Sequence, residues 1–209
     1  MKTFLFDLDG TLLDSIELIL TSFHHTSRAH LGREFTDDYW LAGVGTPLRE
    51  QLAAIATDDT ERDAMLETYI AFNLAQHDEL AKPFPGVTDA IVALHARRVP
   101  MALVTSKLRR GATRGLKLLG LESELSTMVC ADDVTHGKPH PEPVLKALEA
   151  LDEDPSSAIF IGDSVHDIHA GQAAGVATAA VGWGPFPREI VDSAAPNRWF
   201  ESPEEWLDL

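Results

Sequence analysis

The sequence predicts an α/β fold, a Rossmann-like doubly wound parallel sheet that carries an inserted α-helical domain. Short runs that are apolar on both faces recur along the chain, as the buried strands of a covered parallel sheet require. From residue 86 onward, these runs alternate with segments of helical spacing, which is typical of a doubly wound sheet. Residues 14–85 break the alternation because they carry helical patterns alone.

The core elements follow in order from these patterns. Strands are expected at residues 2–6, 101–104, 128–131 and 158–161, with a weaker one at 177–181. Three helices are expected between them, because apolar residues there recur three or four positions apart. Their apolar faces are Val87, Ala90, Ile91 and Leu94, then Leu108, Ala112, Leu116 and Leu119, and then Val144, Leu145, Leu148 and Leu151.

The insertion carries three more helical faces. They are Ile16, Ile19, Leu20 and Phe23, then Leu48, Leu52 and Ile55, and then Met65, Leu66, Tyr69, Ile70 and Phe72. The proline- and glycine-containing stretch 82–86 punctuates the return and could serve as a hinge. We therefore expect an α/β core of residues 1–13 and 86–209, and a helical domain of residues 14–85.

Composition excludes several classes of function. The 209 residues include 17 Lys and Arg against 33 Asp and Glu, which gives a net charge of −16. Because nucleic acids and anionic membranes are polyanions, neither is an expected partner, whereas a small anionic substrate requires only local cations. A single cysteine, Cys130, excludes an internal disulfide. With no apparent signal peptide or membrane span, we expect a cytoplasmic protein, and the oligomeric state stays open.

Polar residues follow each expected strand, at the edge of the sheet where open α/β folds bind ligands. The stretches are 7–11 (Asp-Leu-Asp-Gly-Thr), 105–107 (Thr-Ser-Lys), 137–139 (Gly-Lys-Pro) and 162–167 (Gly-Asp-Ser-Val-His-Asp). Carboxylates, hydroxyls and a lysine in this combination suit phosphoryl transfer assisted by a divalent metal.

The chemistry assigns each group a role. Asp7 can attack phosphorus, and Asp9, two residues on, can exchange protons with a leaving group or water. Two like charges 4 Å apart repel by about 4 kcal/mol at an effective dielectric of 20, so carboxylates beside a phosphate need cations. Mg²⁺ bridging Asp7 and Asp163 would supply part of this compensation, and Lys138 more. The Thr105 hydroxyl can hold phosphoryl oxygens, and it can also cap the following helix.

Taken together and in this order, the four stretches resemble the motifs of the haloacid dehalogenase (HAD) superfamily, over residues 4–167. The resemblance implies that Asp7 forms an aspartyl-phosphate and that Asp9 is the general acid/base. It implies a Mg²⁺ site built from Asp7, the backbone carbonyl of Asp9, and Asp163. It also implies that residues 14–85 form a helical cap. The remaining roles it implies are phosphate binding by Thr105, Ser106 and Lys138, and support of the metal site by Asp167, which could otherwise merely cap a helix.

Finer features narrow the expected activity. Dehalogenases of this superfamily lack the second acid, so Asp9 favours a phosphatase or a phosphomutase. Residues 45–48, 72–78, 105–109 and 132–143 resemble the bacterial inorganic pyrophosphatase and phosphoglycolate phosphatase branches. We therefore expect a Mg²⁺-dependent phosphohydrolase acting on pyrophosphate or phosphoglycolate, with a sugar phosphomutase as the alternative. A phosphorylated receiver domain fits less well, because receivers place the phosphorylated aspartate on a middle strand and have no cap.

Arg49 is the candidate substrate residue of the cap. It follows a Gly-Val-Gly-Thr-Pro turn at residues 43–47, which could face the site. A guanidinium there could clamp the far anion of a substrate when the cap closes. The competing interpretation is an ordinary surface arginine.

Overall fold

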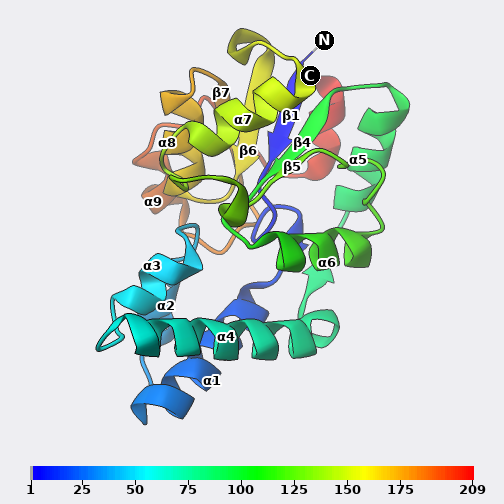
Figure 1. Ribbon diagram of the computed structural model, residues 1–209. Coiled ribbons are helices and arrows are strands. Elements are labelled where there is room, and N and C mark those ends of the chain that lie inside the picture. Colours follow the sequence, from blue (N-terminus) through cyan, green and yellow to red (C-terminus); the bar gives the residue numbers. More distant parts are fainter. Residues whose placement is uncertain (1) are drawn as a thin grey trace.

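Six parallel strands form the central sheet of the computed structural model, which describes residues 2–209 (Figure 1). In spatial order they are β5 (Met128–Val129), β4 (Met101–Val104), β1 (Thr3–Phe6), β6 (Ala158–Gly162), β7 (Ala177–Val181) and β8 (Arg198–Phe200). In the register, Leu5 of β1 lies opposite Ala102 of β4 and Phe160 of β6. The first strand of the chain therefore lies inside the sheet, and its carboxyl end opens between two neighbours.

Helices cover both faces of the sheet, as the doubly wound fold predicts. Phe4 and Phe6 of β1 pack on one side, against the helices α5 (Val87–Ala96) and α6 (Arg109–Leu119). Leu5 points to the other side, towards α7 (Glu142–Leu151) and α8 (Val165–Ala173). Because successive strand residues point to opposite faces, all of β1 is buried. The shorter elements of the core are α9 (Arg188–Asp192) and the 3₁₀ turns η1 (Ala131–Asp133), η2 (Pro155–Ser157) and η3 (Pro203–Asp208).

Residues between β1 and α5 form a separate helical layer, seen below the carboxyl edge of the sheet in Figure 1. Its helices are α1 (Ile16–Leu31), α2 (Asp37–Leu41), α3 (Leu48–Ala53) and α4 (Asp59–Leu80). They share an apolar cluster, in which the rings of Phe23 and Trp40 stack with centroids 4.3 Å apart. We call this layer the helical insert. The chain enters and leaves it through two short antiparallel strands, β2 (Leu13–Asp14) and β3 (Lys82–Pro83).

Three local details differ from the sequence-based expectation. The strand expected at 128–131 stops at Val129, because the carboxylate of Asp133 accepts the backbone N–H of Cys130 at 2.8 Å and turns the chain. The strand β8 was not expected, because its three residues include the exposed Arg198 and lack a buried run. The pair β2–β3 was also missed, since each strand has only two residues. None of the helices between residues 2 and 209 is both long and apolar enough to span a membrane.

Candidate active site

The carboxyl ends of β1, β4 and β6 bring the expected polar residues to one place. Asp7 directly follows β1, and its backbone N–H donates to the carbonyl of Ile161 at 2.9 Å, which extends the ladder to β6 by one residue. Thr105 directly follows β4, and its N–H donates to Val129 at 2.9 Å. Both side chains are buried, with only 5% of Asp7 and 4% of Thr105 exposed. The rigid sheet therefore holds these two groups at its carboxyl edge.

Lys138 lies between two carboxylates. Its Nζ is 2.9 Å from Oδ1 of Asp7 and 2.6 Å from Oδ1 of Asp167. Burial disfavours the charged lysine, but the two carboxylates outweigh it and raise the pKa of Lys138 above its usual value. The lysine is thus a permanent cation next to Asp7. The other oxygen of Asp167 accepts the backbone N–H and the hydroxyl of Ser164, so Asp167 both caps α8 and holds Lys138.

Asp163 presents one free oxygen to the same place. Its Oδ1 accepts the hydroxyl of Thr11 at 2.9 Å, whereas its Oδ2 is buried without a hydrogen-bond partner. Gly10 makes room for this carboxylate: a Cβ at that position would lie 2.4 Å from Oδ2, and the backbone there has a φ of +84°. Only glycine adopts this backbone geometry without strain and leaves the space empty.

These carboxylates fit a divalent cation. Asp7, Asp163 and Asp167 each offer an oxygen within 4.8 Å of the others. Burial is the main cause that raises the pKa of Asp7 to about 7, with Lys138 opposing it, and burial also raises the pKa of Asp163. An unpartnered buried carboxylate oxygen is costly, and hard oxygen ligands are the preferred ligands of Mg²⁺. Since both oxygens of Asp167 are already engaged, Asp7 and Asp163 are the residues whose oxygens suit the metal.

Asp9 is not part of that cluster and has partners of its own. Its Oδ1 accepts the hydroxyl of Ser15 at 2.5 Å, and both of its oxygens accept Nζ of Lys107, at 2.8 and 3.0 Å. Neither Ser15 nor Lys107 is among the site residues expected from the sequence. For Lys107 a signal was present, because it directly follows Thr105 and Ser106 at the end of an expected strand. For Ser15 there was none, since only the turn after β1 brings it back to Asp9.

Thr105 and Ser106 have different surroundings. The hydroxyl oxygen of Thr105 accepts the backbone N–H of Lys107 at 3.1 Å, and the N-cap of α6 is Leu108, so Thr105 does not cap that helix. The hydroxyl of Ser106 donates to the carbonyl of Gly45 in the helical insert at 2.6 Å. Ser106 therefore joins the core to the insert in this conformation.

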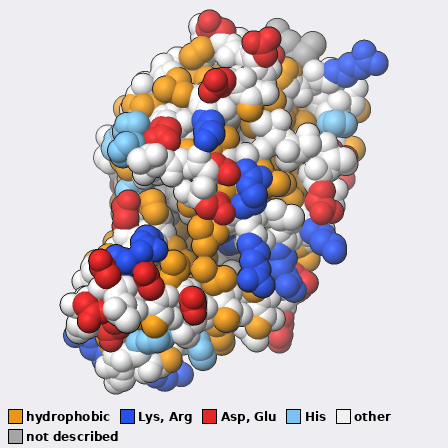
Figure 2. All heavy atoms as spheres, viewed as in Figure 1, with side chains coloured by type: hydrophobic (Ala, Val, Ile, Leu, Met, Phe, Trp, Pro, Cys, Tyr) orange, Lys and Arg blue, Asp and Glu red, His pale blue; other side chains and the backbone are white. Residues whose placement is uncertain are grey.

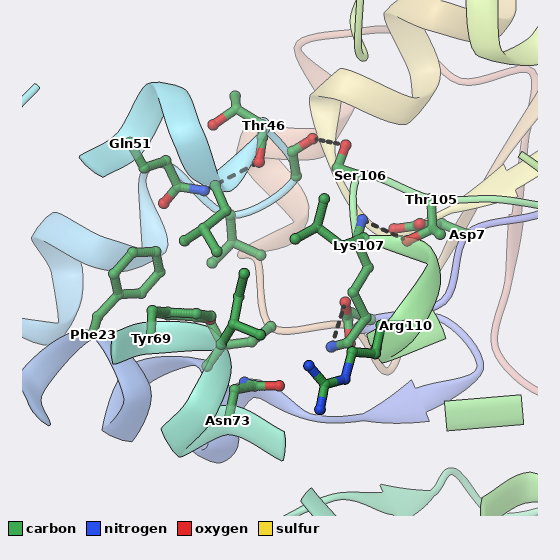
Figure 3. A pocket seen from close by; sticks show the side chains of 18 of the residues that line it. Asp7, Phe23, Thr46, Gln51, Tyr69, Asn73, Thr105, Ser106, Lys107 and Arg110 are labelled. Carbon is green, nitrogen blue, oxygen red and sulfur yellow. Dashed lines mark hydrogen bonds and ion pairs between the residues drawn. The ribbon is translucent and has the colours of Figure 1, made fainter. Parts of the chain in front are cut away.

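A cavity of about 260 Å³ opens between the carboxyl edge of the sheet and the helical insert (Figure 3). Its core wall contains Asp7, Asp9, Thr105 and Asp163. Its opposite wall is largely apolar, and Figure 2 shows hydrophobic side chains gathered in the hollow between the insert and the core. The residues of that wall include Ile19, Phe23, Val44, Leu48, Tyr69, Ile70 and Leu74.

Arg49 and Arg110 differ in whether their side chains line the cavity. Arg49 forms an ion pair with Asp63 at 2.8 Å within the insert, and it does not line the cavity in this conformation. Arg110, from the first turn of α6, does line it. The structure thus brings Asp7, Asp9, Thr105, Ser106, Lys138, Asp163 and Asp167 together, but not Arg49.

The family of haloacid dehalogenase-like hydrolases matches residues 4–181, and the chain belongs to this family. Among its relatives is a pyrophosphatase PpaX of Anoxybacillus flavithermus, 41% identical over 100% of this chain and 96% of that protein. The pyrophosphatase PpaX of Oceanobacillus iheyensis is 40% identical with the same coverage.

Solved structures agree on the fold. A Lactobacillus plantarum protein assigned as a phosphoglycolate phosphatase has a TM-score of 0.88 and 26% identity, covering 99% of this chain and 98% of that one. A Thermotoga maritima protein assigned as a β-phosphoglucomutase has a TM-score of 0.76 and 28% identity, covering 100% and 97%. The family and these relatives make the chain an enzyme of the HAD phosphatase class.

Proposed function

We propose that this enzyme is a Mg²⁺-dependent pyrophosphatase that works through an aspartyl-phosphate on Asp7. One observation carries the reaction type: Asp7 lies in the floor of the cavity beside a permanent cation, Lys138, and near an unpartnered oxygen of Asp163. A nucleophilic carboxylate needs a neighbouring cation both to stay ionised inside the protein and to approach an anionic phosphate.

The first step is attack of an Asp7 oxygen on phosphorus. The new P–O bond forms as the bond to the leaving group breaks, and Asp9 gives its proton to the leaving oxygen. In the second step Asp9 takes a proton from water, which attacks phosphorus and breaks the bond to Asp7. Inorganic phosphate leaves and the carboxylate of Asp7 is restored. The hydrogen bonds from Ser15 and Lys107 hold Asp9 in place for both transfers.

The other residues of the site would bind the transferring group. Thr105 and Lys138 would hold its oxygens, with Ser106 next to them. Asp7, Asp163 and the backbone carbonyl of Asp9 would hold Mg²⁺, and Asp167 would act indirectly through Lys138. When bound, Mg²⁺ would offset the carboxylate charges and polarise a phosphoryl oxygen.

The helical insert would act as a cap over this reaction, with residues 14–85 as the cap and residues 1–13 and 86–209 as the core. Two contacts support this role. Ser106 donates to Gly45, and the guanidinium of Arg114 in α6 donates to both oxygens of Asp78 in α4, at 3.0 and 2.9 Å. Both contacts could break and reform as the cap moves, because each joins groups at the surface of two separate layers.

Pyrophosphate is the favoured substrate because relatives that align with the whole chain are named pyrophosphatases. The second candidate is a phosphate monoester with a compact organic leaving group, such as phosphoglycolate. The apolar wall of the cavity favours it, since carbon atoms would contact Phe23 and Leu48 more favourably than phosphate oxygens would. A sugar phosphomutase is the remaining alternative.

We further propose that the enzyme acts in the cytoplasm on a small phosphorylated molecule, without a nucleic acid or membrane partner.

The test is Mg²⁺-dependent phosphate release from pyrophosphate, phosphoglycolate and several sugar phosphates. Asp7→Asn serves as the blank, because it keeps the shape of the side chain and removes the nucleophile. We expect the highest kcat/KM with pyrophosphate and no release by the variant. A preference for phosphoglycolate would retain the mechanism and change the substrate. Transfer of phosphate between positions of a sugar without net release would identify a mutase.

A further inference from the structure

We propose that Arg110 binds the second anionic group of the substrate, and so selects pyrophosphate over phosphates that have no such group. This inference rests on the proposed pyrophosphatase function. Arg110 is the second residue of α6, and Figure 3 shows its side chain in the cavity, directed towards the side where Asn73 lies.

The two walls of the cavity differ in charge. Within the described residues, the helical insert contributes no charged side chain to the lining: it offers apolar groups, the hydroxyl-bearing Thr46 and Tyr69, and the amides of Gln51 and Asn73. The core wall contributes the carboxylates of Asp7, Asp9, Asp132 and Asp163, which repel a second phosphate. A cation that binds the second anionic group of a substrate must therefore come from the core side of the cavity.

The basic side chains on the core side of the cavity differ in whether a carboxylate already pairs with them. Lys138 is engaged by Asp7 and Asp167, and Lys107 by both oxygens of Asp9. Arg110 makes no hydrogen bond or ion pair with any residue between 2 and 209, and its side chain is exposed. Of the basic side chains that line the cavity, Arg110 alone thus has its charge uncommitted to a described residue.

The neighbouring arginine shows why position along the helix matters. Arg109 uses its guanidinium inside the core, where it pairs with Asp133 and donates to the carbonyl of Met128 at 3.0 Å. Because successive helical residues point about 100° apart, Arg110 faces a different direction and reaches the cavity. Its planar guanidinium can donate two parallel hydrogen bonds to a phosphate, a geometry that a lysine cannot reproduce.

The experiment compares Arg110→Ala and Arg110→Lys with Arg49→Ala as the matched control, since Arg49 is an arginine near the cavity that is paired with Asp63. The substrates are pyrophosphate and phenyl phosphate, which has no second anion. We expect Arg110→Ala to lower kcat/KM for pyrophosphate by at least about tenfold, equivalent to about 1.4 kcal/mol, mainly through KM. Phenyl phosphate should change less than about twofold, Arg110→Lys should recover part of the loss, and Arg49→Ala should leave both substrates within about twofold.

Equal losses with both substrates, or a larger loss in Arg49→Ala, would overturn the assignment of Arg110. A second measurement does not depend on turnover: calorimetric binding of methylenediphosphonate in the presence of Mg²⁺, with methylphosphonate as the singly anionic reference. Arg110→Ala should weaken binding of the diphosphonate alone. If the diphosphonate fails to bind, or binds wild type and variant equally, Arg110 does not recognise a second anion. If it binds through Arg110 but pyrophosphate is not hydrolysed, the pyrophosphatase function fails while the recognition stands.

Discussion

Lys138 and Asp167 form an ion pair in which Nζ lies 2.6 Å from Oδ1 and neither side chain is more than 1% exposed. The sequence distance between them is 29 residues, so only the fold brings them together. Asp167 is fixed in turn by Ser164, and Lys138 also contacts Asp7 at 2.9 Å. The orientation of the lysine beside Asp7 therefore depends on Asp167, which is itself fully buried.

Asp167→Asn should destabilise the enzyme strongly. The change removes one charge of a buried pair, and breaking such pairs costs about 3–5 kcal/mol. We expect a fall in the free energy of unfolding of this size, measured by urea denaturation. Ser164→Ala is the control, since it removes an N-cap hydroxyl worth about 1 kcal/mol and leaves the ion pair intact. Similar losses in the two variants would mean that the pair adds little beyond the helix cap.

Asp7→Asn should stay folded, and its stability should depend less on pH. Burial raises the pKa of Asp7 to about 7 in the folded protein, from a usual value of 3.8. The folded state then binds the proton more tightly than the unfolded state. The resulting stabilisation is complete below about pH 3.8 and is lost as the pH rises through 7. In EDTA, the free energy of unfolding of the wild type should fall between pH 5 and pH 8, and that of the variant should fall less. Parallel pH curves would contradict a raised pKa at Asp7.

Mg²⁺ should raise the melting temperature through Asp7 and Asp163. A ligand that binds only the folded state at 100 times its Kd stabilises it by about 2.7 kcal/mol.

Because the pKa values of both carboxyls are raised, metal binding should release protons, and affinity should increase from pH 5.5 to 7.5. Calorimetry in buffers of different ionisation enthalpy measures this release. Asp163→Asn should lose the Mg²⁺ effect, with NaCl of matched ionic strength as the control; an unchanged shift in that variant would remove Asp163 from the metal site.

Arg114→Ala should loosen the contact between the helical insert and the core without unfolding either. The pair with Asp78 joins α6 to α4, and both side chains are partly exposed, at 40% and 56%. Exposed pairs contribute little to stability because solvent screens them, so the melting temperature should change little. Amide hydrogen exchange in the 43–47 turn should nevertheless become faster, because the contact between insert and core is weakened.

The control for that measurement is Arg28→Ala, which removes an exposed ion pair with Glu34 lying wholly within the insert. Exchange in the 43–47 turn should stay at the wild-type rate in this variant. Equal acceleration in both variants would show that the pair between Arg114 and Asp78 has no special part in holding the helical insert to the core.

Much of the core could be predicted because its signals are local. A buried strand in a covered sheet needs apolar residues on both faces, and a polar residue directly after it marks the edge where ligands bind. Asp7, Thr105 and Asp163 therefore follow from their positions after β1, β4 and β6. The short elements β2, β3 and β8 could not be predicted in this way, since two or three residues carry no periodicity.

No local sequence pattern indicated which residues would contact the site residues. Asp9 meets Lys107 across 98 positions of the sequence, and Arg110 rather than Arg49 lines the cavity. Sequence spacing places a residue on one face of its own helix, but the direction of that face depends on how the helix packs. The glycine-containing turn before Arg49 indicated a residue that faces the site. The packing of α3 against α4 instead brings Arg49 to Asp63.

Short-range sequence patterns are enough to predict the α/β core, the helical insert and the polar residues that directly follow the strands, because each of these features depends on neighbours in the chain. The ion pairs of these groups depend instead on how the segments pack: Lys138 pairs with Asp7 and Asp167, and Lys107 pairs with Asp9. The packing also leaves Arg110 as the basic side chain at the cavity that has no ion-pair partner among the described residues. The physical reason is that ion pairing depends on distances of a few ångströms, and those distances arise from packing between segments that are remote in the chain.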